Sequence, residues 1–496
     1  MASALEWQQK PVNTTSKVPV ITNWTPVIGY MLFQDDATTA SYFYYKLVLE
    51  VRLNDASGTL LAKIKQRRNG YSSDVTNNKA RAFFDLREIV NSQLVHTVFD
   101  QNDSGVPFRT LHKVGANTAT LPFSVNGDRN TDETQIQKIY VKGYQEYSTS
   151  ASASPSEVTS DSVNDTLYYL QASLPLMTPR STDANYIQGT DFNVYNSSGA
   201  TDKFLSDVET DSGDYNTSGY INYVQWNDTT EVGDYHTVAF LNDNSNFDSA
   251  LTQIQIAYYN SSNALIGDAE YIANTNTNGG EVPTDGSLTN SERLLYFGCG
   301  PANLEAQSRN TDARPSNKSG WAYYTIRGTS DTPTNPATST NKTAAYYFIK
   351  QDGSCKGYNV RRLAWINSKG GYDYFNFKLK STQTVNVERN NYNKMLGTFS
   401  GSKWRYNNTQ RGKTTRQTTA TLKEIINTDY ISEQQANLIE KLIMSSDVQV
   451  VENSDTTYTQ AVMITSSSHV RKTVANDKLI QYTIEIEYAN PLNTNS

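Results

Sequence analysis

The feature that most constrains the fold of this chain is a two-residue alternation of apolar and polar side chains in SYFYYKLVLEVRL, residues 41–53. A period of two places alternate side chains on opposite faces of a pleated strand, so this segment is expected to be a half-buried strand. NDASG then favours a turn, and TLLAKIKQ provides the second strand of a hairpin. The side chains expected on the buried face are Phe43, Tyr45, Leu47, Leu49, Val51 and Leu53.

The composition extends the β prediction to the whole chain of 496 residues. Tyrosine occurs 33 times, and β-branched and aromatic side chains suit a half-buried pleated surface, whereas Asn and Ser suit its turns. A chain of this length is too long for one ordinary core. We therefore predict a mainly β protein. It should contain several antiparallel β-sandwich domains, immunoglobulin- or fibronectin-like in size, and a small α+β C-terminal part with one capped helix.

Residues 1–145 are expected to form an N-terminal β-sandwich with one short helix. The segment FFDLREIV predicts that helix, because Asp85 and Glu88 have the spacing of a capping box. Leu86 and the apolar residues after it then mark one helical face. Further strands of the same sandwich are predicted at TLPFSV, residues 120–125, and at QIQKIYVKGYQEY.

Two further regions follow in the sequence. Residues 148–165 have few apolar side chains and are expected to be a linker or an exposed loop. Residues 146–345 should form a β-rich middle region with long loops of Asn, Ser and Thr. Residues 346–496 should form an antiparallel sheet plus a helix over 432–446, which Ser432 begins with a capping box.

Catalytic motifs are absent from the sequence. Each of the four histidines stands alone, outside any metalloprotease or nucleophile motif. Cys299 and Cys355 have neither zinc-site spacing nor a disulfide framework and are expected to be buried thiols. We predict no catalytic, cofactor-binding or metal-binding residues and a protein that is not an enzyme. A glycan depolymerase with an acid pair at glycosidase separation remains an alternative.

Two short motifs partly match the sequence patterns of known binding sites, one for dinucleotides and one for calcium. GCGPANL lacks the third glycine of a dinucleotide loop, so a tight turn between strands is expected there. Asp207, Glu209 and Asp211 are spaced as in a calcium loop, but Ser212 stands at the sixth position, where an EF-hand needs glycine. A solvated polar loop is favoured over an irregular calcium site.

Charge argues against nucleic acid as the general partner, because the net charge is −7. The one basic cluster is KWRYNNTQRGKTTRQ, where cations alternate with aromatic rings. Such a cluster can bind single-stranded nucleic acid, but contact with an acidic neighbouring subunit is favoured in an acidic protein. Its candidate assembly contacts are Trp404, Arg405 and Tyr406.

The last strand-like segment, LIQYTIEIEY, supplies the other candidate contacts. Tyr482, Ile484 and Ile486 alternate with polar residues. If this strand adds to the sheet of the next subunit, assembly proceeds by β-strand addition.

Neither an export signal nor a membrane span is expected. The first fifteen residues have no apolar core, and no run of eighteen apolar residues occurs. Synthesis in the cytoplasm without a signal peptide is therefore expected.

Three stretches resemble virion structural proteins of tailed bacteriophages, especially those of marine and Bacteroidetes-infecting phages. They are FFDLREIV; RRLAWINSKGGYDYFNFKLKSTQTVNVERNNYNKMLG; and ISEQQANLIEKLIMSSDVQVV with QAVMITSSSHVRKT and DKLIQYTIEIEYANP. They cover both ends of the chain well and the middle third poorly.

The resemblance implies a structural part of the tail, neck or baseplate, located in the virion. It implies a ring or other symmetric oligomer of identical copies, with neighbouring phage structural proteins, and a host surface, as further partners. It carries over no catalytic residue. The alternative function is a tail fibre or tip adhesin that binds a host surface or glycan.

Overall fold

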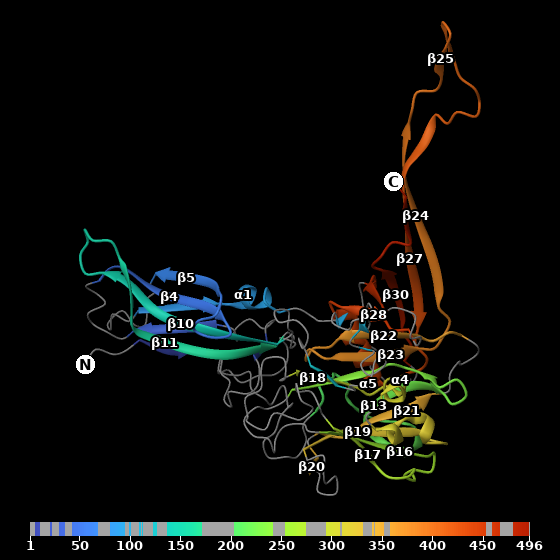
Figure 1. Ribbon diagram of the computed structural model, residues 1–496, viewed down its shortest axis with the longest axis horizontal. Coiled ribbons are helices and arrows are strands. Elements are labelled where there is room, and N and C mark those ends of the chain that lie inside the picture. The colour runs from blue at the N-terminus through green and yellow to red at the C-terminus, as the bar shows by residue number, and fades with distance from the viewer. Residues whose placement is uncertain are drawn as a thin grey trace. The chain divides into compact units, whose positions relative to one another are not determined.

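The structure is a computed structural model, drawn in Figure 1, and its chain forms two compact units. Unit 1 comprises Met1–Lys350 and Asn367–Asp373, and unit 2 comprises Gln351–Ile366 and Tyr374–Ser496. Both are built mainly from antiparallel strands, as the composition predicts. The structure describes residues 5–9, 20–21, 29–34, 42–67, 80–94, 99–100, 109–110, 112, 123–125, 136–170, 203–241, 253–273, 294–307, 310–330, 340–341, 343–351, 358–452, 459–466 and 480–495.

The predicted boundary after residue 145 is wrong, because it falls inside strand β10 (Ile136–Ser148). That strand belongs to a five-stranded sheet of unit 1 with the order β2 (Val20–Ile21), β11 (Ser156–Leu170), β10, β4 (Phe43–Leu53) and β5 (Leu60–Arg67). The alternation in β4 is largely confirmed, since its alternate residues from Tyr45 to Val51 are buried. Phe43, at the start of the strand, is exposed.

The linker expected over residues 148–165 is also wrong. Most of it is β11, which pairs with β10 as the second strand of a long hairpin. Polar side chains contribute to holding this strand. Glu157 accepts hydrogen bonds from Lys63 on β5 and from Tyr144 on β10. A solvated hairpin therefore resembles a linker in composition, because its pairing uses backbone groups that any residue supplies.

The short helix α1 (Arg87–Asn91) is present, but the capping box predicted for it is wrong. The N-cap is Leu86, which makes no side-chain cap bond. Asp85 is the last residue of strand β6 (Ala80–Asp85) and forms an ion pair with Arg87, Oδ2 to Nη2 2.6 Å. The apolar face is as predicted, since Leu86, Val90 and Leu94 are buried.

Unit 1 also contains an eight-stranded and a three-stranded sheet. The main strand order of the eight-stranded sheet is β12 (Thr210–Ser212), β13 (Ser218–Asn227), β21 (Tyr346–Gln351), β19 (Tyr323–Ser330), β16 (Gln253–Tyr259) and β17 (Glu270–Ala273). In addition, β14 (Val232–Gly233) pairs with β13, and β20 (Thr340–Asn341) pairs with β19. The smaller is β15 (Thr237–Leu241), β18 (Leu294–Gly298) and β9 (Phe123–Val125). Buried side chains of both sheets, such as Trp226 and Phe297, form one cluster.

Two predictions for this part of unit 1 are wrong. Residues 123–125 of TLPFSV pair with β18 and not with the first sheet, because a three-residue strand carries no signal for a distant partner. Gly298-Cys299-Gly300 is not a turn between strands. It joins β18 to helix α4 (Pro301–Ala306), where Pro301 suits the first helical position.

The remaining described strands of unit 1 are short. β1 (Glu6–Gln9) and β3 (Gly29–Gln34) form a three-stranded sheet with β6, and β7 (Phe99–Asp100) pairs with β8 (Arg109–Thr110).

Unit 2 is built on a sheet with the main order β23 (Tyr372–Phe377), β22 (Arg361–Ile366), β28 (Val448–Val450), β29 (Gln460–Ile464), β30 (Thr483–Tyr488), β27 (Lys413–Asn427) and β24 (Thr382–Asn393), where β31 (Asn493–Asn495) also pairs with β27. Helix α5 (Glu433–Met444) buries Ala436, Ile439 and Leu442. Its capping box is present as predicted, since Ser432 and Gln435 exchange side-chain to backbone hydrogen bonds.

Replacing Ser432 with alanine should lower the free energy of unfolding of unit 2 by about 1 kcal/mol, because the N–H of Gln435 loses its acceptor. Urea unfolding followed by circular dichroism measures this. The control is Ser446→Ala, an exposed serine beyond the helix, which should change stability by less than about 0.5 kcal/mol. Equal effects of the two substitutions would contradict the capping role.

Candidate functional site

Within the described ranges, no three His, Cys, Asp or Glu side chains are grouped so that they could hold a metal ion. None of the helices among those residues is both long and apolar enough to cross a membrane.

The described histidines and cysteine lie in the core of unit 1. His112 packs edge-on against Tyr372 and His236 against Phe348, with ring centroids 4.7 and 4.9 Å apart. Cys299 is a buried free thiol, as predicted. His96, His469 and Cys355 lie outside the described residues.

The residues predicted as a weak calcium motif do not converge. Asp207 accepts hydrogen bonds from the N–H and hydroxyl of Ser368, at 2.7 and 2.6 Å. Asp211 accepts from the N–H of Ser212 in its own strand. Their oxygens are thus engaged with different parts of unit 1.

Sequence reasoning missed a buried carboxyl group beside Asp207. Asp373 accepts hydrogen bonds from the Ser206 hydroxyl (2.6 Å) and from the N–H of Asp207 (2.9 Å). Burial, with the charge of Asp207 beside it, raises the pKa of Asp373 to about 7. No local pattern could have revealed this, because the two aspartates are 166 residues apart in the chain.

The predicted contacts on the last strand are not at a free edge. β30 pairs with β27 on one side and with β29 on the other. Ile484 and Ile486 are buried, and the backbone of Tyr482 is bonded to Thr428. Strand addition through β30 is therefore wrong for this fold, because central strands have no unpaired backbone groups to offer.

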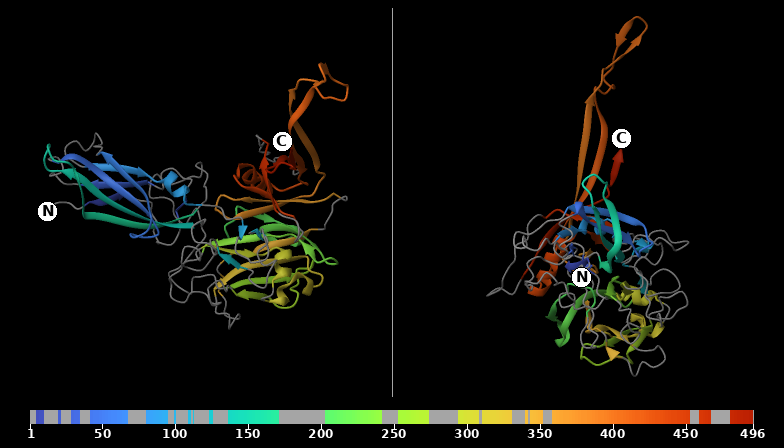
Figure 2. Two further views of the ribbon diagram at one scale, coloured as in Figure 1. Left: turned by 45° about the horizontal axis from the view of Figure 1, so that its top comes forward. Right: turned by 90° about the vertical axis from the view of Figure 1, so that its left-hand side faces the viewer.

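The other three predicted contacts lie on a long two-stranded hairpin of unit 2. We call residues 382–427 the arm. Its strands β24 and β27 pair from Thr382↔Ile425 to Asn393↔Lys413. The ribbon extends away from the other strands of its own sheet, as Figures 1 and 2 show. All twelve residues of β24 are exposed, and among the described residues only β27 pairs with this strand.

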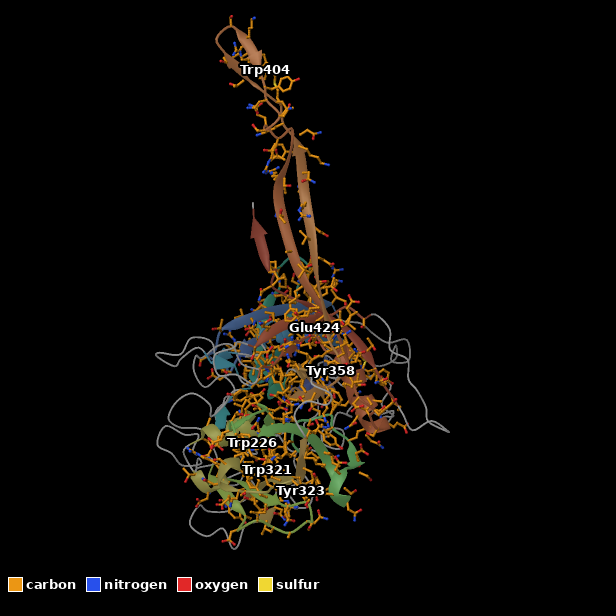
Figure 3. All side chains as sticks on the ribbon, turned by 90° about the vertical axis from the view of Figure 1, so that its right-hand side faces the viewer. Trp226, Trp321, Tyr323, Tyr358, Trp404 and Glu424 are labelled. Atoms are coloured by element: carbon orange, nitrogen blue, oxygen red, sulfur yellow. The ribbon has the colours of Figure 1, made fainter. Side chains whose placement is uncertain are left out.

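The arm tip, residues 394–412, has a defined conformation. β25 (Thr398–Ser400) pairs with β26 (Lys403–Arg405) and places Trp404 at the far end of the arm (Figure 3). The Trp404 indole donates a hydrogen bond to the carbonyl of Leu396 (3.0 Å) and packs edge-on against Phe399 at 5.1 Å.

Gly397 makes this packing possible. Its φ is +99°, and a Cβ there would lie 2.4 Å from Nε1 of Trp404. The left-handed conformation and the close approach both favour glycine. Its N–H donates to the side-chain oxygen of Gln410 (2.8 Å), which fixes the loop across the tip. The aromatic groups are thus held in place while they stay in contact with solvent.

The arm exposes an unusual amount of apolar surface. Phe399 is 72% exposed and Tyr406 68%, although neither belongs to a folded core. Contiguous exposed apolar groups on a soluble protein mark interaction sites. The large apolar side chains exposed along the arm before β27 are Val385, Val387, Tyr392, Met395, Leu396, Phe399, Trp404 and Tyr406.

Charge distinguishes the arm from the rest of the chain. Residues 382–416 carry seven Lys and Arg side chains and one carboxylate, Glu388, so their net charge is +6. The whole chain has a net charge of −7, which leaves −13 for the other residues. The arm is therefore a basic, aromatic projection on an acidic protein.

No family model and no curated protein matches this sequence.

Proposed function

We propose that this chain is a structural subunit that assembles with copies of itself through the arm. The observation that carries the proposal is that β24 and the arm tip expose aromatic and cationic side chains that contribute to no core of their own unit. Aromatic residues and arginine are the side chains most enriched at protein–protein hot spots. An isolated two-stranded ribbon is also weakly stable by itself, so contact with a partner would add order to it.

The resemblance of the sequence to tailed-phage virion proteins supplies the setting. In this proposal the subunit belongs to a tail, neck or baseplate, its role is geometric and not catalytic, and the expected β-sandwich domains act as rigid bodies. Self-association places one surface of a copy against a different surface of the next, repeated until the ring closes. Neighbouring virion proteins would be further partners.

The test is the mass of the full chain in solution as a function of concentration. The wild-type protein should self-associate, and the triple variant Phe399→Ala, Trp404→Ala, Tyr406→Ala should weaken association by about 100-fold, since each is an exposed aromatic anchor. Sedimentation velocity measures both.

A matched triple variant controls for the loss of exposed apolar surface. Tyr430, Met444 and Met463 are 54–60% exposed on unit 2 outside the arm tip, and their replacement by alanine should leave association unchanged. A wild-type chain that stays monomeric at all concentrations would remove the proposal.

The same proteins separate the two rival functions. Saturable binding of the monomer to host cells or polysaccharide would favour the adhesin. Binding of single-stranded nucleic acid, lost in the arm variant and weakened by salt, would assign the basic tip to that ligand.

A further inference from the structure

Charges of opposite sign are segregated along this chain. Residues 204–292 contain fourteen Asp and Glu and no Lys or Arg. Residues 389–423, which include the arm tip, contain eight Lys and Arg and no Asp or Glu. Segments that carry a single sign of charge attract each other between molecules and repel their own kind. The acidic stretch therefore has the charge expected of a surface that binds the arm.

The described part of the acidic stretch contributes to a surface rich in tyrosine. Strands β13, β16, β19 and β21 turn one side toward the core cluster and the other toward a smaller cluster of buried and half-buried side chains. We call this second side the tyrosine face. Its members are Tyr215, Tyr223, Tyr259, Tyr323 and Tyr347.

The rings of the tyrosine face stack on one another. Tyr323 lies parallel to Tyr259, with centroids 4.9 Å and planes 11° apart, and Tyr215 stacks on Tyr323 at 6.2 Å and 20°. Tyr323 therefore has two stacked neighbours, whereas Tyr215 ends the column and keeps exposed surface for a ligand. A protein loop with cations and aromatic side chains fits such a surface, because cations and rings both interact favourably with aromatic rings.

A strained loop holds Tyr215 in this column. Tyr215 and Asn216 both have φ of +58°, a left-handed conformation that costs energy for residues other than glycine. The loop packs closely on the sheet, because a Cβ on Gly213 would lie 2.6 Å from Ile221 and 2.7 Å from Ile349. Tyr215 nevertheless stays 37% exposed.

Carboxylates accompany the rings. Burial, together with the negative charges of Asp214 and Asp211, raises the pKa of Tyr223 to about 12. Asp214 is exposed on the loop next to Tyr215. Among the described cations of this sheet region, Lys350 is paired with Asp228 at 2.5 Å and Lys203 lies over Tyr220, whereas Arg327 of β19 is half-buried.

We propose that the arm tip of one copy docks on the tyrosine face of a neighbouring copy, with Lys403 and Arg405 near Asp211 and Asp214 and Trp404 against the exposed side chain of Tyr215. This inference rests on the proposed self-assembly and names its second surface. It is a contact between two different patches, so each copy offers one arm and one face, as ring formation requires.

Charge reversal in the full-length protein tests the pairing. Arg405→Asp and Asp214→Arg should each weaken self-association by about 10-fold or more, because each places like charges together. An equimolar mixture of the two variants should recover association, since the native arm of one meets the native face of the other. Glu231→Lys, at an exposed acid on the turn after β13, is the matched control and should leave association unchanged. Circular dichroism verifies that each variant is folded.

The outcomes separate this inference from the proposed function. Association weakened by Arg405→Asp but untouched by both Asp214→Arg and Tyr215→Ala would leave the arm as an interface and overturn the tyrosine face as its partner. Association untouched by every variant would overturn both. If Tyr215→Ala abolished polysaccharide binding while association persisted, the tyrosine face would be a glycan site and the docking proposal would be wrong.

Discussion

Replacing Glu424 with alanine is expected to lower the free energy of unfolding of unit 2 by about 3 kcal/mol. Glu424 lies near the base of the arm (Figure 3), and its side chain is fully buried. It accepts hydrogen bonds from Arg361 (2.8 Å), from Gln383 of β24 (3.1 Å) and from the hydroxyl of Tyr488 (2.8 Å). Without it, the hydroxyl of Tyr488 loses its acceptor and Arg361 keeps only a 3.5 Å contact with Glu452.

The pH dependence has a defined sign. Burial pushes the pKa of Glu424 upward, but the hydrogen bonds from Arg361, Gln383 and Tyr488 outweigh burial and hold it below the usual value. A lowered carboxyl pKa stabilises the fold above the unfolded value of about 4.5, and that stabilisation is lost as pH falls through the folded pKa. Wild-type unit 2 should lose stability below about pH 4.5, and Glu424→Ala should lose less.

Hydrogen exchange of β27 and β30 in increasing urea reports on unit 2 alone. Glu485→Ala is the matched control, because Glu485 lies on the neighbouring strand and pairs with Lys423 at 3.2 Å while 42% exposed. Its removal should cost less than about 1 kcal/mol. If both substitutions lowered the free energy of unfolding equally, the buried hydrogen bonds of Glu424 would contribute no more to stability than an exposed ion pair.

Asp373→Asn is expected to change the pH dependence of unit 1. With a pKa raised to about 7, Asp373 is protonated in the folded state over a range where the unfolded chain is ionised. The sign is therefore the reverse of that for Glu424. Stability is present below about pH 4 and is lost as pH rises toward 7, by about 2–3 kcal/mol between pH 5 and pH 8.

Asparagine has the shape and hydrogen-bonding groups of the protonated acid. Its amide can donate to the Ser206 hydroxyl while its oxygen accepts from the N–H of Asp207, as the neutral carboxyl group can. The variant should be more stable than wild type at pH 8, and this difference should shrink as the pH falls to 5. Urea unfolding followed by the fluorescence of Trp226 and Trp321, buried in unit 1, measures the difference.

Other ionisable side chains also lie near Asp373 and Asp207. Lys369 donates to the carbonyl of Ser206 at 2.5 Å and lies 3.9 Å from Asp207. His112 contacts Tyr372, the residue next to Asp373, and is present in both proteins. The control Asp228→Asn removes an exposed carboxylate and should leave the profile unchanged. Lower stability of Asp373→Asn at every pH would mean that Asp373 is charged and needed as such.

Local sequence patterns predicted those elements whose stability depends on neighbours along the chain. The alternation in β4 required a half-buried strand, and Ser432 with Gln435 required a helix start, because both patterns act within a few residues. The apolar face of α1 was predicted for the same reason. Its capping box was not, because Arg87 competes successfully for the carboxylate of Asp85.

The tertiary structure alone decided which strands have partners. β11 is polar enough to resemble a linker, and β30 is regular enough to resemble a free edge strand. Both are paired through their backbones with other strands, so both predictions were wrong. The basic aromatic cluster around Trp404 was visible in the sequence, but its position at the end of an exposed arm was not. Its assembly role stays a prediction.

What the sequence determined by itself is the mainly β character, the separation of charge along the chain and the start of α5. These follow from propensities, side-chain ionisation and contacts within a few residues. The buried pair Asp207 and Asp373, the central place of β30 and the arm that carries Trp404 came only from the fold. Each depends on residues far apart in the chain being brought together, and the free energy of such contacts leaves no local pattern.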